Sequence, residues 1–227
     1  MKKFLINLMV LVLIFFILAN YIPYEKGVSI PYVYFSKRNK HRDMKIITFA
    51  DGEKFIKGNH IPKKQDISGK YHPINEFLKG FRPFEIKNPF LGWKWVLENI
   101  KYKNDFKRFG REDVWQFAKT TYLIRTGDCE DSSILLCDWL RSYDYDANVA
   151  VGLFKNYGWH SWVILNTEQK TYLLECTGKK KSLKRGPLLL GIKKHPAQSE
   201  YKTYCIFNER GFWISLEYLK RRNGNGA

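Results

Sequence analysis

Three side chains, in the order Cys129, His160 and Glu175, are of the types that together make a nucleophile, a base and an orienting acid. Cys129 stands in the stretch GDCED, ahead of an apolar run, where a helix is predicted to begin after an N-cap at Asp128. The free N–H groups and the dipole of a first helical turn favour a thiolate. The pattern therefore predicts a thiol enzyme in which His160 is the base and Glu175 orients its ring.

His160 and Glu175 fall in adjacent predicted strands that are expected to pair as a hairpin. A turn at residues 167–168 would make the two direct partners, and a turn centred on 168–169 would make them diagonal neighbours on one face. The intermediate register, with its turn centred on residue 168, would instead bring Cys176 opposite His160. Two of the three registers therefore place the acid beside the base.

The elements that must position these residues follow from the spacing of apolar side chains. Helical spacing predicts helices at 92–100 and 112–124 and a third that begins at Cys129. Alternation predicts a small hairpin over 44–56 that turns at residues 51–52, and further strands at 147–154, 159–165, 171–177, 201–207 and 212–216. Helices followed by antiparallel strands predict an α+β fold with the nucleophile helix packed on the sheet. Because Cys129 shares a helical face with Leu136 and Leu140, its sulfur is expected to face that sheet.

Composition divides the chain into four expected parts. Residues 1–22 hold the apolar stretch 4–21 after two lysines, which predicts a signal peptide or a signal anchor. A small-x-small cleavage pattern is missing, so a single-pass membrane anchor is favoured, with the body outside the cytoplasm on the periplasmic or cell-surface side. Residues 23–89 are expected to be a basic linker with a small N-terminal extension, 90–218 a catalytic domain, and 219–227 a basic flexible tail.

The net charge of +17 raises the question of a nucleic-acid partner. Residues 91–178 carry 11 basic and 12 acidic residues, so the excess lies on the two flanks. This distribution favours a solvated Lys-rich surface, or one that faces anionic lipid or cell-wall polymer. We expect no nucleic-acid partner, and we expect a protein or peptide substrate such as a cell-surface protein.

The acids around Cys129 have two interpretations. Asp128, Glu130 and Asp131 would oppose thiolate formation if they were ionised nearby. They suit the first turn of a helix, or they could bind a divalent cation through oxygen ligands. The four cysteines are not at zinc-binding spacing. A disulfide between Cys176 and Cys205 is allowed outside the cytoplasm.

The segments that carry these residues resemble a known family. The stretches are NIKYKND (99–105), EDVWQFAKT (112–120), GDCEDSSILL (127–136), WHSWVILN (159–166) and YLLECTG (172–178). They resemble the transglutaminase-like superfamily, and most closely its bacterial transglutaminase-like cysteine proteinase branch. The resemblance implies a papain-like fold over residues 90–178, with Cys129 as nucleophile and His160 as base.

The resemblance also bears on the third residue and on cofactors. The third residue of the family is usually Asp, and Glu175 stands in its place. In the proteinase branch acids around the cysteine bind calcium, which implies a calcium site at Asp128, Glu130 and Asp131. No other cofactor is required.

The leading hypothesis is a membrane-anchored, extracytoplasmic thiol hydrolase, a protease or amidase that acts through an acyl-enzyme. The alternatives are a cross-linking acyltransferase and a catalytically silent binding module with the same fold. An upstream tryptophan or Gln116 could join the Cys129 N–H as the oxyanion donor, and the sequence does not choose among them.

Overall fold

The computed structural model describes residues 46–49, 52–168, 170–190 and 200–224. All of them belong to the second of two compact units, residues 1–40 and 41–227. The expected membrane segment, residues 4–21, lies outside the described residues. Among the residues that are described, no helix is long and apolar enough to cross a membrane.

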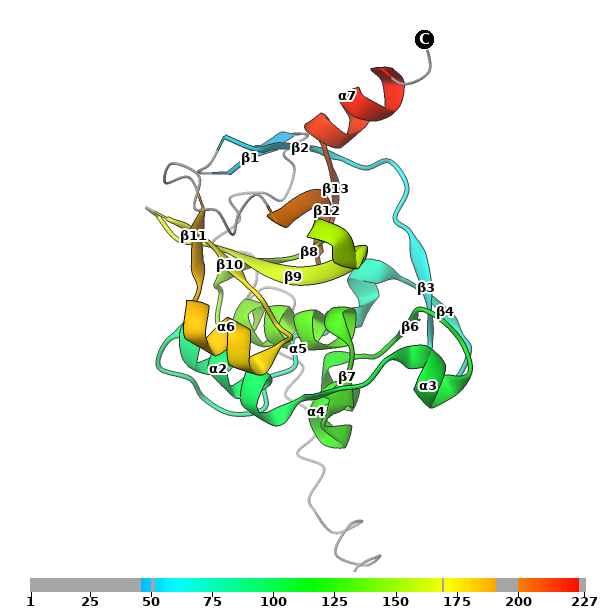
Figure 1. Ribbon diagram of the computed structural model, residues 1–227, viewed down its shortest axis with the longest axis vertical. Helices are drawn as coiled ribbons and strands as arrows, with labels where there is room; N and C mark the ends of the chain where they lie inside the picture. Colours follow the sequence, from blue (N-terminus) through cyan, green and yellow to red (C-terminus); the bar gives the residue numbers. More distant parts are fainter. Residues whose placement is uncertain (1–45, 50–51, 169, 191–199, 225–227) are drawn as a thin grey trace, which may run out of the picture. The chain divides into compact units, whose positions relative to one another are not determined.

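An antiparallel sheet of eight strands forms the centre of the domain (Figure 1). In spatial order its strands are β1 (Ile46–Thr48), β2 (Lys54–Lys57), β13 (Gly211–Ser215), β12 (Tyr201–Asn208), β8 (Asp146–Phe154), β9 (Trp159–Asn166), β10 (Thr171–Leu174) and β11 (Leu188–Leu190). The predicted strands from residue 147 onward are confirmed, as is the closing hairpin of β12 and β13, except that the strand predicted at 171–177 ends at Leu174, so Glu175 follows it. β1 and β2 confirm the hairpin predicted over 44–56, for its described residues.

Helices cover one face of this sheet. α5 (Cys129–Arg141) packs on β8 and β9, and α2 (Pro89–Asn99) and α4 (Ala118–Ile124) pack on α5. α6 (Lys179–Arg185) lies against α2, and all four helices appear below the sheet in Figure 1. This arrangement of helices on an antiparallel sheet confirms the predicted α+β class.

The alternation of β9 explains why the sheet is buried on both faces. Val163 and Leu165 join the apolar cluster under α5, while Trp162 and Ile164 join a second cluster on the other face. The second cluster includes Phe55 of β2, so the N-terminal hairpin covers part of the sheet. His160 is the second residue of β9, so it lies where the strand enters the sheet.

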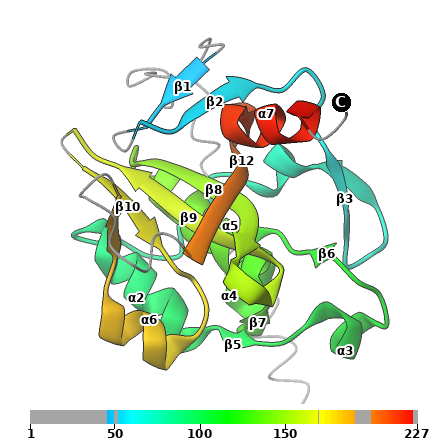
Figure 2. The same ribbon diagram turned by 45° about the horizontal axis from the view of Figure 1, so that its top comes forward.

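Two smaller sheets position the segments around the start of α5. One joins β4 (Tyr71–Pro73), β3 (Lys63–Asp66) and β6 (Val114–Trp115), and it lies to the right in Figure 2. The other pairs β5 (Lys101–Tyr102) with β7 (Thr126–Gly127) in parallel. α3 (Asp105–Phe109) follows β5 directly, so this pairing brings α3 next to the segment that leads into α5.

The helix predicted over 112–124 is correct only from Ala118. Val114 and Trp115 form β6, because they pair with β3 and because the Val114 N–H donates to Asp105 Oδ2 at 2.6 Å. Gln116 is likewise held by its backbone N–H, which donates to Asp131 Oδ1 at 2.8 Å. These tertiary hydrogen bonds override the helical spacing of the apolar residues.

Segments on both sides of the expected catalytic domain are also structured. Residues 62–64 were expected to be exposed linker, but β3 begins at Lys63. Phe77, in the 3₁₀ helix η2 (Ile74–Phe77), is fully buried in the main core, so part of the expected extension packs into the domain. At the other end α7 (Leu216–Gly224) occupies most of the expected flexible tail and lies against β2 and β13.

Candidate active site

Cys129 is the first residue of α5 and Asp128 is its N-cap, as the sequence predicts. The cap is closed by Asp131, whose carboxylate accepts a hydrogen bond from the Asp128 N–H at 3.4 Å. This geometry depends on Gly127, because a Cβ at that position would lie 2.5 Å from the Asp131 Cβ. The glycine before the acid is therefore required by space, and it lets the acidic side chain fold back over the helix start.

His160 and Glu175 lie side by side. Leu174 pairs with Val163, which is the register of a turn centred on residues 168–169 and one of the two that place the acid beside the base. His160 Nε2 lies 2.9 Å from Glu175 Oε2 and 3.1 Å from Oε1. Because an ionised carboxylate can only accept, Nε2 carries a proton, and Nδ1 is left to accept one from another group.

The Glu175 carboxylate is held by two further residues that the sequence did not single out. Thr177 donates to Oε1 from its backbone N–H at 2.9 Å and from its hydroxyl at 2.8 Å. The Tyr201 hydroxyl donates to Oε2 at 2.8 Å. Burial works to raise the pKa of Glu175, but the bonds from His160 and Thr177 outweigh it and lower the pKa. Glu175 therefore stays ionised beside the imidazole.

Cys129, His160 and Glu175 line one cavity of about 610 Å³. The structure thus brings the start of α5 to the start of β9, and all three predicted residues face the same space. That common space is what their proposed chemistry requires.

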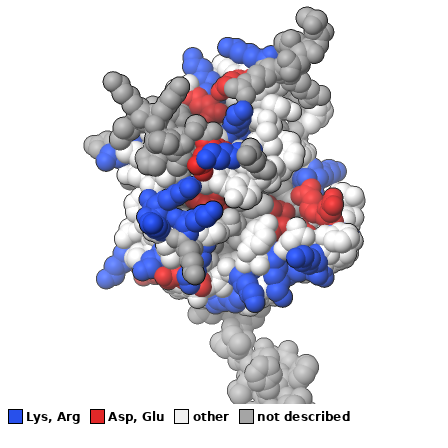
Figure 3. Space-filling model, in the orientation of Figure 1, with Lys and Arg blue, Asp and Glu red and all other residues white. Residues whose placement is uncertain are grey.

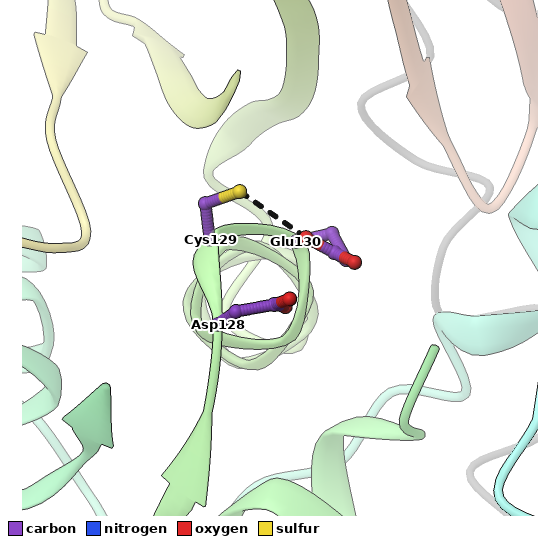
Figure 4. Close-up of side chains that lie close together, drawn as sticks. All are labelled: Asp128, Cys129 and Glu130. Atoms are coloured by element: carbon purple, nitrogen blue, oxygen red, sulfur yellow. Dashed lines mark hydrogen bonds between the residues drawn. The ribbon is translucent and has the colours of Figure 1, made fainter. Parts of the chain in front are cut away.

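The thiol of Cys129 donates to Glu130 Oε2 at 3.2 Å, as Figure 4 shows, and no hydrogen bond joins it to His160 among the described residues. Burial, followed by the charges of Glu130 and Asp128, raises the pKa of this thiol well above its usual range. In this arrangement Cys129 is a protonated thiol. A thiolate therefore requires that the negative charge of the neighbouring acids be offset.

The acids around Cys129 form a larger buried cluster than the sequence indicates. Asp105, the first residue of α3, joins Asp128 and Asp131, and each of the three offers an oxygen within 4.8 Å of the others. Glu130 groups instead with Asp128 and the Cys129 sulfur. Burial raises the pKa of all four carboxyl groups.

The donor set of this cluster fits a hard divalent cation. Oδ1 of Asp105 and Oδ1 of Asp128 are buried and accept no hydrogen bond among the described residues. Both oxygens of Asp131 already accept bonds, from the Gln116 N–H and from the Gln116 side-chain amide. Unpartnered buried carboxylate oxygens are costly, and a cation such as calcium would satisfy them. The cluster can therefore bind a metal ion, with Asp105 and Asp128 as its least satisfied ligands.

Most of the proposed oxyanion donors are engaged elsewhere. Trp93 Nε1 donates to the Glu175 carbonyl at 2.8 Å and Trp115 Nε1 to Asp113 Oδ1 at 2.7 Å. The Gln116 side-chain amide donates to Asp131 and to the Thr126 carbonyl. The Cys129 N–H remains the best-placed oxyanion donor, because N–H groups in the first turn of a helix have no partner within the helix.

The other three cysteines lie away from this chemistry. Cys137 and Cys176 are buried, and Cys205 packs against the main core as a partly buried side chain. All four cysteines are free thiols, so the bridge allowed between Cys176 and Cys205 is not formed. Their roles in the described domain are those of small packing residues.

Residues 113–221, just under half of the chain, match the family model of the CEP76 peptidase-like domain. This stretch contains Cys129, His160 and Glu175 and all of the sheet from β8 to β13. This match supports a peptidase-type fold for the domain, as the resemblance of the sequence to the transglutaminase-like superfamily predicts.

Solved structures show a weaker likeness. LapG from Legionella pneumophila is 16% identical over 66% of this chain and 80% of its own, with a TM-score of 0.43. A calcium-bound LapG structure is also 16% identical, over 61% and 74% of the two chains, with a TM-score of 0.41. A putative cysteine protease from Cytophaga hutchinsonii is 16% identical over 72% and 63%, with a TM-score of 0.36. No curated protein matches the chain.

Proposed function

We propose that the protein is a thiol hydrolase, a peptidase or amidase, with Cys129 as nucleophile, His160 as base and Glu175 as the orienting acid. The observation that supports this most directly is the bond between His160 Nε2 and Glu175, in a cavity that Cys129 also lines. Glu175 holds the ring and stabilises the imidazolium that forms. The peptidase-like family model, which covers all three residues, supports the same reaction class.

The reaction proceeds in two halves. Nδ1 of His160 takes the proton of Cys129, whose sulfur attacks the carbonyl carbon of the scissile amide. The oxyanion accepts from the Cys129 N–H, and the imidazolium returns its proton to the leaving amine as the C–N bond breaks. Water then loses a proton to His160 and attacks the thioester, which releases the carboxylic acid and restores the thiol.

The acids next to Cys129 regulate the first proton transfer. While Glu130 accepts from the thiol, the sulfur proton is held away from His160. We propose that Asp105, Asp128 and Asp131 hold calcium, which would offset their charge and so favour the Cys129–His160 ion pair. Asp131 keeps its bonds to Gln116 and fixes the start of α5.

The test is an alkylation and trapping experiment on the described domain with its preceding residues, 23–227. With calcium present, we expect rapid carboxymethylation of Cys129 at neutral pH, and a much lower rate in His160→Ala. Hydroxylamine should trap the thioester of a cleaved peptide as a hydroxamate. A Cys129 no more reactive than a free cysteine, with no thioester in any peptide mixture, would show a binding module. Release of labelled amine adducts in place of acid would show acyl transfer.

We also propose that residues 4–21 anchor the domain in the cell membrane, with the domain outside the cytoplasm and a protein substrate within reach. The support is the apolar stretch after two lysines. Fractionation of the full chain and of residues 23–227 provides the test. The full chain should sediment with membranes, and protease added to spheroplasts, whose cytoplasmic membrane is intact, should digest its domain. Protection from that protease would overturn the orientation.

A further inference from the structure

The wall of the active-site cavity beside the catalytic residues is basic. Lys155, Lys181 and Arg185 line the same cavity as Cys129. Two of them belong to α6, in which five of the seven residues are Lys or Arg. Figure 3 shows Lys and Arg side chains gathered over this part of the surface. The entrance to the nucleophile is therefore positively charged.

The charges in this wall do not cancel. Glu200 accepts from Lys155 at 2.5 Å and from Arg185 at 3.3 Å, so one carboxylate serves two cations. Lys181 forms no ion pair with any residue that the structure describes. Glu175, the other acid of the wall, is already bonded to His160. The wall thus has surplus positive charge, and its own Glu200 shows that these cations can hold a carboxylate.

A second basic pocket adjoins the first. It is lined by Lys103, Lys107 and Arg108 of the β5–α3 segment, and it shares Tyr102 with the active-site cavity. Lys103 and Lys107 form no ion pair within the described ranges. A chain that passes over Cys129 and Tyr102 would therefore meet unpaired cations in both pockets.

Exposed aromatic rings lie between these cations. Tyr157, Trp159 and Tyr102 line the active-site cavity and are 74%, 65% and 54% exposed. Large aromatic side chains with this exposure are typical of surfaces that bind a partner. Together with the free lysines they form a cleft that is apolar and basic, which suits a polypeptide with acidic residues.

We propose that the cleft selects an acidic polypeptide segment, with carboxylates bound by Lys181 and Arg185 in one pocket and by Lys103 and Lys107 in the other. The proposal deepens the proposed function, on which it rests, by naming the substrate class. A protein substrate is favoured over nucleic acid because the cations share the wall with two carboxylates, which a continuous phosphate backbone would have to pass.

Binding can be measured apart from turnover with the full-length Cys129→Ala protein. The probes are a fluorescent peptide of Ala, Ser and Gly with Glu at every third position, and the same peptide with Gln. We expect the Glu peptide to bind about tenfold more tightly at low salt, with the difference shrinking as salt is added. Lys181→Glu and Lys107→Glu should each weaken it roughly three- to tenfold and leave the Gln peptide unchanged.

Lys57→Glu is the matched control, because Lys57 lies in β2, which β13, β12 and β8 separate from β9. It should change neither affinity. Equal binding of the two peptides would overturn the proposal. So would an oligonucleotide of equal charge that binds as tightly as the Glu peptide, because the surface would then be a general polyanion site.

Turnover by the wild-type protein separates this inference from the proposed function. Selective binding of the Glu peptide without hydrolysis of any peptide would refute the hydrolase and leave the acidic selectivity standing. Hydrolysis of the Glu and Gln peptides at equal rates would refute the selectivity and leave the hydrolase standing.

Discussion

The domain contains two histidine–carboxylate pairs of nearly the same local geometry, and only one of them is placed for catalysis. In His160–Glu175 and in His72–Asp66, Nε2 lies 2.9 Å from a carboxylate oxygen. The side chains are 14% exposed in the first pair and 12% exposed in the second. Neither the hydrogen bond nor the burial distinguishes them.

The second ring nitrogen and the surrounding space make the difference. Nδ1 of His72 faces Glu76 at 3.6 Å, and the ring packs edge-on against Phe77 and Phe117. The Ser68 hydroxyl donates to Asp66 at 2.6 Å, and no hydrogen bond joins it to the His72 ring among the described residues. His160 instead borders a cavity with a thiol. A histidine–acid pair therefore indicates catalysis only when the second ring nitrogen of the histidine faces a group that it can deprotonate.

The largest contrast is expected between His160→Ala and His72→Ala. Loss of the base should lower the second-order rate of Cys129 alkylation, and of any peptide turnover, by roughly 10²- to 10⁴-fold. His72→Ala should leave both rates within about twofold, since it touches no residue of the cavity. Rates measured at equal folded concentration make the comparison. An equal loss in both variants would contradict the distinction between the two pairs.

The next largest difference is expected between substitutions of the two carboxylates, Glu175 and Asp66. Glu175→Gln removes the charge that stabilises the imidazolium and should cost roughly 10- to 100-fold in kcat, with little change in KM. Asp66→Asn should leave kcat unchanged and lower only the melting temperature. Stopped-flow kinetics and thermal unfolding on the same preparations distinguish these results. A kcat for Glu175→Gln equal to that of the wild type would remove Glu175 from the mechanism.

Calcium should change the reactivity at the His160–Glu175 site, and this effect should not depend on the His72–Asp66 pair. If Asp105 and Asp128 hold the ion, saturating calcium should raise the melting temperature by roughly 5–10 °C and speed the alkylation of Cys129. Asp105→Asn should abolish both effects, whereas His72→Ala should retain them. Magnesium at the same concentration serves as the control for ionic strength. Full calcium responses in Asp105→Asn would show that the ion binds elsewhere.

The smallest effect is a pH dependence of the second pair. Burial works to raise the pKa of Asp66, but bonds from Ser68, His72 and Lys70 outweigh it and lower the pKa to about 2. The stability this supplies is complete above about pH 4 and is lost as the pH falls toward 2. Urea unfolding should therefore show Asp66→Asn less stable than wild type at pH 6, with the gap closing below pH 4. A gap that is constant with pH would contradict this assignment.

The sequence was sufficient where the chain folds locally. Cys129, His160 and Glu175 lie within 47 residues of one another, at the start of α5, near the start of β9 and just after β10. The apolar periodicity of these elements is strong enough to give the helix start and the strand pairing. The hairpin length left two registers that both served the triad, and the observed one is the diagonal arrangement. The catalytic roles themselves stay predictions until they are tested by substitution.

The parts of the site that the sequence did not indicate are brought together by pairing between distant segments. Asp105 reaches the acid cluster through β5 and β7, two-residue strands with no recognisable pattern. Tyr201 reaches Glu175 from β12, whose Tyr201 pairs with Phe154 at the far end of β8. α6 is lysine-rich and has no apolar stripe, so its part in the cavity wall was not foreseen. The place of Asp105 in the acid cluster therefore depends on a pairing of two-residue strands, which has no signature in the sequence.

The pairing of β2 with β13 has a consequence for the order of folding. Lys57 is joined to Trp213, so closing this edge of the sheet encloses almost the whole described domain in one loop. Such closure is entropically slow, whereas α5, β8, β9 and β10 meet through short connections. We expect hydrogen exchange during refolding to protect the catalytic segment first and the β1–β2 hairpin last. The segment that carries Cys129, His160 and Glu175 would then fold before β1 and β2 have paired with β13.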